Sequence, residues 1–375
     1  MEDSGDFADL LSRAELAFEE SSGCPVVLSH PVVIKDWRRS RVLRCKVESS
    51  AAAIPSLILK QIKEEPERGF SDWASLAFLE GQPGAHELVP RFLGGDPVSR
   101  LFLMGDLGEG RNLQGILTGG NPTEVVAALR DLASRMARLH SSTVGKEDAF
   151  DAIRSSLPGG SGLGRKKEAE NWLVSREKIF AWFEALGCQC PAGFADSLAF
   201  IAAAYADAEG FLAFSHGDPA PSNNHFSQAG PRLIDFEYGG FRHALYDITA
   251  WNVLCPLPVA LVEEMRKCFR DELARSFPLA RDELRFSEAW ACLCAYRAWA
   301  ILTWIPPDVI RENRPWADSW GMREAVFVAL SRMAGCAPAG KALEASHEAA
   351  LILLRAMGKQ WHSFDSERDL LPKWS

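Results

Sequence analysis

The sequence predicts a two-lobed α+β fold, in which a small β-rich lobe with one main helix precedes a larger, mostly helical lobe. Three strand-like runs, PVVIKDW, RVLRCKV and SLILKQIK, lie close together near the N-terminus. Beyond Gly110 the pattern changes, because apolar residues in TEVVAALRDLASRMARLH recur at helical spacing. The length of 375 residues is enough for two or three domains or for one large two-lobed protein.

The elements of the small lobe follow from local patterns along the chain. Residues 7–20 have the spacing of a short amphipathic helix, and the three strand-like runs come after it. SDWASLAFLEG predicts a helix that begins near Ser71 or Asp72 and ends near Gly81. VPRFLGG and SRLFLMGDLG predict two further strands.

The second lobe is predicted to be helical, with one strand-and-loop insert at residues 211–241. We place the boundary so that residues 1–104 form the N-terminal lobe and residues 105–375 form the C-terminal lobe. Besides the helix quoted above, helical patterns cover residues 171–186, 192–208, 258–275, 286–304, 321–334 and 342–360.

The composition excludes several classes of protein. The net charge is −9 and the isoelectric point is about 5.5, whereas sequence-independent binding to nucleic acid needs a basic surface. MEDSGDFADLL lacks the basic and apolar segments of a signal peptide, and no apolar run reaches the roughly 18 residues of a membrane span. The nine cysteines lack the paired C-x₂-C spacing of a zinc site, so we expect free thiols and a cytoplasmic location.

One short stretch, FSHGDPAPSNNHF at residues 214–226, combines polar side chains with turn-forming residues. It contains Asp218 and Asn223, and the run RLIDFEYGG then places Asp235 after an apolar, strand-like segment. The intervening HFSQAGPRLID predicts a hairpin with QAGP at its turn, which would return Asp235 to Asn223. The spacing from Asp218 to Asn223 equals that between the catalytic Asp and the metal-binding Asn of the protein-kinase catalytic loop.

Phosphoryl transfer needs few chemical groups, and these residues supply them. A carboxylate must orient and deprotonate the attacking hydroxyl, oxygen ligands must hold Mg²⁺, and a cation must contact the phosphates. Taken singly, Asp218, Asn223 and Asp235 are more typical of turns and caps. Their joint spacing, with Lys60 upstream in a strand, favours the catalytic interpretation. Asn224 does not fit the offset and is interpreted as a cap or loop residue.

HGDPAPSN, LIDFE and HALYDITAW resemble motifs of the aminoglycoside phosphotransferase and choline kinase-like superfamily, whose members have a protein-kinase-like bilobed fold. The resemblance covers roughly residues 24–255. It implies an enzyme that uses ATP and Mg²⁺ to move the γ-phosphate to a hydroxyl of a small molecule. It also implies that the N-terminal lobe binds the nucleotide and the C-terminal lobe binds the acceptor.

The resemblance also assigns roles within the catalytic loop. Asp218 corresponds to the catalytic base, while Asn223 and Asp235 correspond to the metal ligands. His216 and Asp247 would support the catalytic loop.

The nucleotide-binding residues are implied in the same way. LILKQIK is similar to the family strand that carries the phosphate-binding lysine, here Lys60. FSDWASLAFLEG resembles the helix whose acid pairs with that lysine, and the sequence leaves Asp72 and Glu80 as alternatives for this acid. Met104 and Asp106 lie in the segment MGDLG, which resembles the nucleotide-binding hinge.

The loop KDWRRSRV departs from the family pattern because it contains no glycine, so its backbone amides would approach phosphates less closely. Arg39, Ser40 and Arg41 are expected either to contact the phosphates through side chains or to form a solvated basic turn.

The acceptor is expected to be a small molecule, because the sequence has no A-P-E segment of the protein-kinase type. Aromatic and acidic side chains near the C-terminus suit a cationic acceptor such as an aminoglycoside or a choline-like amine, although a tryptophan-rich helical core is the alternative. The side chains concerned are Trp290, Trp299, Trp304, Trp316, Trp320, Asp308, Glu312 and Asp318.

Two other functions stay open at this level. A pseudokinase would bind a nucleotide or a protein partner without turnover, which the glycine-free loop favours and the intact Asp218, Asn223 and Asp235 oppose. A metal-dependent phosphohydrolase would use the same carboxylates without needing Lys60.

Overall fold

The computed structural model describes residues 7–48, 54–160, 164–208, 210–255, 257–317, 320–336 and 340–361. Their contacts divide them into two compact units. The first unit contains the described residues of segments 1–120, 142–162 and 216–240, and the second contains those of 121–141, 163–215 and 241–375. The segment from His216 to Asp235 therefore belongs to the first unit. The lobe boundary at residue 104 stays a prediction.

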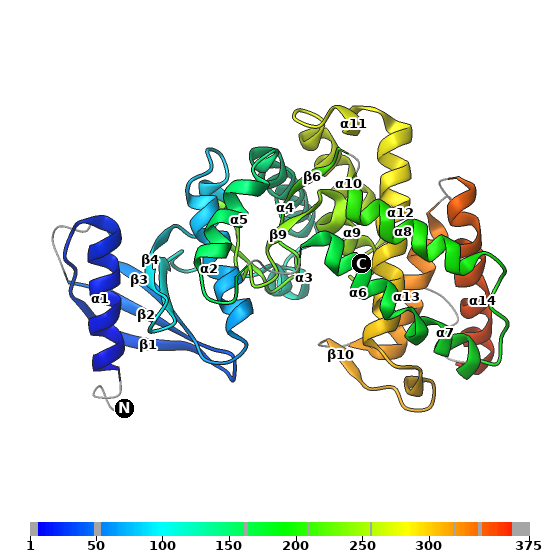
Figure 1. Ribbon diagram of the computed structural model, residues 1–375, viewed down its shortest axis with the longest axis horizontal. Helices are drawn as coiled ribbons and strands as arrows, with labels where there is room; N and C mark the ends of the chain where they lie inside the picture. Colours follow the sequence, from blue (N-terminus) through cyan, green and yellow to red (C-terminus); the bar gives the residue numbers. More distant parts are fainter. Residues whose placement is uncertain are drawn as a thin grey trace. The chain divides into compact units, whose positions relative to one another are not determined.

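An antiparallel sheet of five strands forms the centre of the first unit (Figure 1). Lys60 lies in the middle strand of this sheet, where it pairs with Val42 on one side and Phe102 on the other. The sheet agrees with the five strand-like segments of the sequence. In spatial order the strands are β1 (Leu28–Asp36), β2 (Ser40–Val47), β3 (Ser56–Ile62), β5 (Leu101–Gly105) and β4 (Phe92–Asp96).

Helix α1 (Ala8–Ser22) packs against this sheet, mainly on β4 (Figure 1). The core beneath it comes from alternate strand positions such as Leu43, Leu57 and Leu103, which are fully buried. Alternation is expected of strands with one face on a helix, because successive side chains point to opposite faces.

Helix α2 (Pro66–Glu80) is the main helix of the first unit. The sequence placed its start near Ser71 or Asp72, which is too late. Pro66 occupies the first turn, where its missing N–H costs no hydrogen bond. Helix α2 packs on α5 (Glu147–Ser156), with the rings of Phe78 and Phe150 edge to face at 5.6 Å.

A hairpin of β7 (Asn224–Ser227) and β8 (Gly230–Leu233) lies within the segment from His216 to Asp235 of the first unit. Ser227 pairs with Gly230, so Gln228 and Ala229 form the turn, and the predicted hairpin is confirmed. The remaining elements of the first unit are α3 (Leu113–Gly119) and the short 3₁₀-helix η1 (His86–Leu88).

The second unit is mostly helical, and α12 (Glu283–Trp304) is buried at its centre against α7, α8, α9 and α13. Two short strand pairs, β6 (Leu212–Ser215) with β9 (Gly240–His243) and β10 (Pro315–Ala317) with β11 (Trp320–Gly321), accompany the helices. The other helices are α4 (Pro122–Thr143), α6 (Arg165–Val174), α7 (Arg176–Ala185), α8 (Phe194–Asp207), α9 (Leu245–Val253), α10 (Val259–Leu273), α11 (Pro278–Arg281), α13 (Met322–Gly335), α14 (Glu344–Gln360) and the 3₁₀-helices η2 (Pro307–Ile310) and η3 (Lys341–Leu343).

One helix expectation was wrong. Residues 171–186 contain parts of two helices, α6 and α7, which meet at Ser175. The Ser175 hydroxyl donates to the carbonyl of Asn171 at 3.0 Å, a side-chain bond that competes with regular helix geometry. The α+β fold class is otherwise confirmed. In the described part of the chain, no helix combines the length and apolarity needed to span a bilayer.

Candidate active site

A buried cluster of three charged side chains connects the sheet, α2 and the segment after β8. The Lys60 ammonium donates to Oδ2 of Asp72 at 2.6 Å and to Oδ1 of Asp235 at 2.9 Å. We call these three residues the Lys60 cluster. The side chains of Lys60 and Asp72 are 11% and 2% exposed, whereas that of Asp235 is 28% exposed. Asp235 therefore presents the carboxylate of the cluster that solvent and ligands can reach.

Electrostatics keep Lys60 and Asp235 charged. Burial alone would lower the pKa of Lys60, but the carboxylates of Asp72 and Asp235 raise it above its ordinary value. Burial would raise the pKa of Asp235, but the ammonium of Lys60 lowers it. Two carboxylates share one ammonium, which leaves a negative charge that a further cation can balance.

The acid of α2 that pairs with Lys60 is Asp72. Its second oxygen, Oδ1, accepts the backbone N–H of Phe236 at 2.8 Å, so Asp72 also holds the chain next to Asp235. Glu80, the alternative left open by the sequence, instead accepts bonds from Arg91 at 3.2 Å and from the N–H of Phe92 at 3.0 Å.

The backbone at Asp235 is left-handed, with φ of +67°. This conformation is uncommon for a residue other than glycine and costs of order 1–3 kcal/mol, so surrounding contacts must maintain it. Here those contacts are the Lys60 ion pair and the bond from Phe236 to Asp72. Strain of this kind concentrates at functional sites.

His216 joins the catalytic-loop segment to the strand that precedes Asp235. Its Nε2 donates to the carbonyl of Ile234 at 2.9 Å, and its Nδ1 accepts from the N–H of Asp218 at 3.3 Å. Its ring packs against Phe236 with centroids 4.4 Å apart. These contacts connect the loop to the segment that carries Asp235, while support of catalysis by His216 stays a prediction.

Gly217 permits a close approach between this loop and the segment beyond Asp235. Its φ is +84°, and a Cβ atom at this position would lie 2.2 Å from the carbonyl oxygen of Tyr238. Only glycine satisfies both the torsion and the space.

Asp218 and Asn223 contact each other directly. Asn223 Nδ2 donates to the backbone carbonyl of Asp218 at 3.0 Å and to its carboxylate Oδ2 at 3.2 Å. The carbonyl of Asn223 accepts the N–H of Ile234 at 3.2 Å, which brings Asn223 to the residue next to Asp235. The first unit thus gathers Lys60, Asp218, Asn223 and Asp235 into one region.

Asn224, the neighbouring amide, has different surroundings. It is buried, its Oδ1 accepts the N–H of Leu113 at 2.7 Å, and its Nδ2 donates to the carbonyl of Ala220 at 3.3 Å. Both ends of the amide hold backbone, as the cap or loop interpretation expects.

The side-chain oxygens of Asp235 and Asn223 are of the kind that Mg²⁺ prefers. Asp235 offers a partly exposed carboxylate and Asn223 an amide oxygen, which are hard oxygen donors. Within the described ranges, no group of three or more His, Cys, Asp or Glu side chains is arranged to bind a metal. A cation here would complete its shell with water and phosphate oxygens, as Mg²⁺ commonly does.

The hinge residues of the sequence prediction lie in or beside β5. Asp106 is a structural acceptor, because its carboxylate accepts hydrogen bonds from the Ser56 hydroxyl at 2.7 Å and from Arg44 Nη2 at 3.1 Å. The Ser56 and Arg44 bonds lower its pKa although burial opposes them. Met104 pairs with Ile58 in β3 and is half-buried. Nucleotide contacts by Met104 and Asp106 stay predictions.

Ser40 begins β2 opposite Ile62, and its carbonyl accepts the N–H of Trp37 at 2.9 Å. This bond closes the turn between β1 and β2. A phosphate contact by Ser40 stays a prediction.

Two residues of this region were not singled out as a pair from the sequence. Arg39 Nη1 donates to both carboxylate oxygens of Glu237, at 2.8 and 3.0 Å. Their separation of 198 residues leaves no local pattern to detect, and the only signal was the position of Glu237 close after Asp235.

Asp247 lies in the second unit, in the first turn of α9. Its Oδ1 accepts from the hydroxyl of Ser215 at 2.9 Å, and its Oδ2 lies 3.8 Å from Nε2 of His140. Ser215 precedes His216 in the chain, but support of the catalytic loop by Asp247 stays a prediction.

The tryptophans proposed for an acceptor site have mixed environments in the second unit. Trp290 and Trp299 are buried in α12, and Trp299 Nε1 donates to Ser346 at 2.7 Å. These two are core residues, as the alternative interpretation expects. Trp304 is 49% exposed, and Trp316 is half-buried in β10. Asp318 and the side chain of Trp320 lie outside the described part of the chain.

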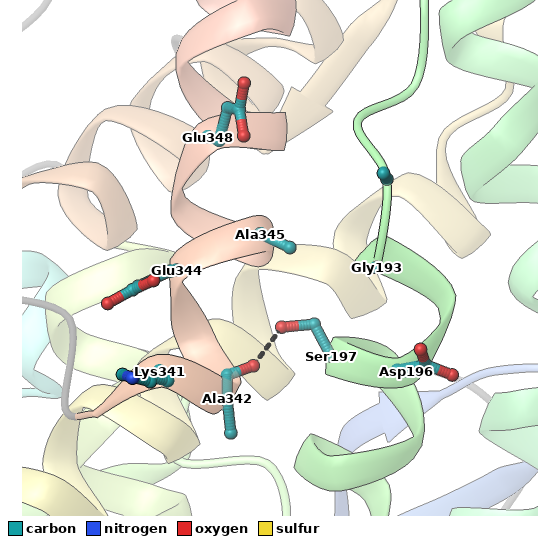
Figure 2. Close-up of a pocket in the computed structure, with 9 residues that line it drawn as sticks. Gly193, Asp196, Ser197, Lys341, Ala342, Glu344, Ala345 and Glu348 are labelled. Carbon is teal, nitrogen blue, oxygen red and sulfur yellow. Dashed lines mark hydrogen bonds between the residues drawn. The ribbon is translucent and has the colours of Figure 1, made fainter.

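A cavity of about 410 Å³ lies between the start of α8 and the start of α14 in the second unit (Figure 2). Asp196, Glu344 and Glu348 line it together with Lys341. All four side chains are exposed, so the acids are ordinary solvated surface groups. The cavity adds no group to the Lys60 cluster.

A family model agrees with this arrangement. The model described as the phosphotransferase enzyme family matches residues 74–286, which is more than half of the chain. The chain belongs to this family. The prediction of a small-molecule phosphotransferase is therefore confirmed, while neither the donor nor the acceptor is specified by the match. A comparison with curated protein sequences gives no match.

A solved phosphotransferase structure shares the fold of this chain at low identity, and two others are similar to it with lower scores. The macrolide 2′-phosphotransferase from Brachybacterium faecium is 15% identical, with a TM-score of 0.50 over 80% of this chain and 92% of its own. A choline kinase from Cryptosporidium parvum is 11% identical, with a TM-score of 0.45 over 92% of this chain and 91% of its own. The enzyme of the streptomycin–ATP–APH(2″)-IIa ternary complex is 12% identical, with a TM-score of 0.48 over 80% of this chain and 90% of its own.

Proposed function

We propose that this phosphotransferase moves the γ-phosphoryl group of ATP to a hydroxyl of a small, amine-bearing molecule. The observation that carries the proposal is the Lys60 cluster, in which a buried lysine contacts an acid of α2 and the strained, partly exposed Asp235. A lysine so placed can contact the phosphates of a nucleotide, and Asp235 beside it can help to bind their cation.

Asp218 is proposed as the base. Its carboxylate would accept the proton of the attacking hydroxyl while the Asn223 amide, 3.2 Å away, keeps that carboxylate oriented. Positioning carries most of the effect, because the transition state of phosphoryl transfer is loose. His216 would position the backbone of Asp218 through the bonds of its two ring nitrogens.

Mg²⁺ is the proposed cofactor, with Asp235 and Asn223 as its protein ligands. When bound, it would neutralise charge on the phosphate oxygens. The excess negative charge of the Lys60 cluster supports this choice.

An amine-bearing acceptor is proposed because the chain carries excess negative charge. The chain carries −9 overall, and the exposed acids Asp308 and Glu312 follow Trp304, which is 49% exposed, within eight residues of the sequence. Cationic groups are attracted to indole faces and carboxylates. Aminoglycosides and choline-like amines have the required combination of hydroxyl and cation. We also propose a cytoplasmic location, which the nine free cysteines support.

The test is release of ADP from ATP and Mg²⁺ with a panel of acceptors. The panel contains an aminoglycoside, choline, ethanolamine, a macrolide and a neutral sugar. Acceptor-dependent release with an amine would support the proposal. A neutral sugar as best substrate would reject the amine class alone. Nucleotide binding without turnover on any acceptor would favour a pseudokinase. Phosphate release from simple phosphate esters at the same rate as from ATP would favour a phosphohydrolase.

A further inference from the structure

Backbone hydrogen bonds fix the turn between β1 and β2. The N–H of Trp37 donates to the carbonyl of Ser40 at 2.9 Å, which closes the turn. The carbonyl of Arg39 accepts the N–H groups of Lys63 at 2.9 Å and Glu64 at 3.3 Å. A phosphate is bound by N–H donors, and without glycine the peptide N–H groups of this turn would approach it less closely. Its side chains are the groups that it can offer.

The two arginines at this turn differ in what they contact. Arg38 pairs with Glu64, and its side chain is 80% exposed. Arg39 reaches Glu237, which lies two residues after Asp235 and is only 18% exposed. The same turn therefore sends one guanidinium to the surface and the other to the segment that carries Asp235.

A further positive charge acts on this segment. Lys35 in β1 lies close enough to Asp235 to help lower the pKa of that carboxyl, although Lys60 has the larger effect. Lys35 and Lys60 thus act on Asp235 itself, whereas Arg39 contacts Glu237, two residues further along the chain. Both oxygens that Arg39 contacts, at 2.8 and 3.0 Å, belong to the carboxylate of Glu237.

We propose that Arg39 binds the terminal phosphate of the nucleotide and that Glu237 is its resting partner. The inference rests on the proposed function. Binding of a nucleoside triphosphate would move the guanidinium from the carboxylate of Glu237 to phosphate oxygens. A guanidinium forms strong, charge-assisted bonds with either group, so the exchange replaces one anion by another. In this phosphotransferase a side chain would do what glycine-loop amides do elsewhere.

The exchange predicts a preference among nucleotides. Arg39 would contact the terminal phosphate of a triphosphate, so its loss should weaken a triphosphate more than a diphosphate. Arg38 offers a matched control, because it is the same residue type in the same turn but pairs with Glu64 instead.

The experiment is calorimetric titration with Mg²⁺ and either a non-hydrolysable ATP analogue or ADP. Arg39→Ala should weaken binding of the analogue about tenfold and binding of ADP less than about threefold, as expected for loss of a charge-assisted bond. Arg38→Ala should change both constants less than about twofold, in line with an exposed ion pair. Equal behaviour of the two variants would overturn the inference.

Glu237→Gln tests the resting partner. Removing its charge should free Arg39 and tighten binding of the analogue about twofold or more, and this gain should vanish in an Arg39→Ala background. If Glu237→Gln weakens binding as Arg39→Ala does, the ion pair only braces the turn and the exchange is wrong.

Failure of the inference is separable from failure of the proposed function. A wild-type protein that binds neither nucleotide would reject the function. A wild-type protein that binds the analogue, with Arg39→Ala unchanged, would reject only the inference. Should Arg39→Ala unfold, Arg39→Lys keeps the charge without the planar fork. It should then show a weakened preference for the triphosphate, and an unchanged preference would contradict the proposal.

Discussion

Each unit contains a buried ion cluster, and the two clusters use similar groups differently. In the Lys60 cluster, two carboxylates share one ammonium, and Asp235 is partly exposed on a left-handed backbone. In the second unit, Arg242 donates to both carboxylate oxygens of Glu168, at 2.9 Å for Oε2, and the hydroxyl of Tyr205 donates to the same carboxylate. We call Glu168, Arg242 and Tyr205 the Glu168 cluster.

Aromatic rings enclose the Glu168 cluster. Tyr205 stacks on Tyr296 with centroids 4.2 Å apart, and the guanidinium of Arg297 lies 3.4 Å from the ring centroid of Tyr246. Burial would raise the pKa of Glu168, but Arg242 lowers it, so the pair stays ionised. One carboxylate meets one guanidinium, and the tyrosine completes the hydrogen bonding.

The difference separates a structural ion cluster from the proposed binding site. The Glu168 cluster is neutral in total and satisfied, so it fixes helices and β9 without attracting a ligand. The Lys60 cluster has excess negative charge, strain and access. We therefore expect substitutions in the two clusters to affect different measurements: stability for the Glu168 cluster, and nucleotide binding or turnover for the Lys60 cluster and its neighbours.

The largest effect is expected at Asp218, beside the Lys60 cluster. Asp218→Asn should keep its fold and its nucleotide affinity but lose about 10²–10⁴-fold in kcat, since it removes the proposed base. The loss will be nearer the lower figure if proton transfer lags behind bond cleavage. Steady-state kinetics with the best acceptor measure it. Wild-type turnover would remove Asp218 from the mechanism.

The corresponding substitution in the Glu168 cluster should change the stability of the fold. Glu168→Gln leaves the buried Arg242 without a counter-charge, which should lower the free energy of unfolding by about 3–5 kcal/mol. Denaturant unfolding measures this value, and calorimetry at a temperature where the variant is folded should return the wild-type nucleotide Kd. A large loss of nucleotide affinity in the folded variant would contradict the distinction between the clusters.

A buried histidine next to Arg242 gives the second unit a pH dependence. His243 stacks on Phe211, and its Nδ1 accepts the N–H of Leu245 at 3.1 Å. Burial, with a smaller effect of His140, lowers its pKa from 6.5 to about 3. The unfolded chain therefore binds a proton between these values that the folded chain does not, and stability is lost as pH falls through this window. The slope from this residue is at most about 1.4 kcal/mol per pH unit.

Unfolding curves from pH 7 to pH 4 test this slope. His243→Gln should flatten the dependence of the unfolding free energy on pH by up to one proton. If the free energy of unfolding depends on pH equally in wild type and His243→Gln, other groups cause the loss of stability at low pH.

The smallest effect is expected at the unused acid of α2. Glu80 contacts an arginine that is 63% exposed, so Glu80→Gln should cost less than about 1 kcal/mol and leave the nucleotide Kd within about twofold. Asp72→Asn should weaken nucleotide binding far more, because it removes the counter-charge of Lys60. Equal effects in the binding titration would contradict the assignment of Asp72.

The sequence predicted the sheet and the approach of Asn223 to Asp235, because both depend on local patterns and one short hairpin. It left Asp72 and Glu80 open, because eight residues span a little over two helical turns and put both acids near one face. Packing decided between them. The break at Ser175 was missed because the apolar spacing continues through it. The pair of Arg39 and Glu237 depends on tertiary contact alone.

The central claim is that the Lys60 cluster, and not the Glu168 cluster, binds the nucleotide with its cation. Calorimetric titration of Mg²⁺ with the non-hydrolysable ATP analogue into wild type, Asp235→Ala and Glu168→Gln tests it most directly. We predict wild-type affinity for Glu168→Gln and a loss of at least about tenfold, together with the loss of Mg²⁺ dependence, for Asp235→Ala. Equal, Mg²⁺-dependent affinity in wild type and Asp235→Ala would contradict the account.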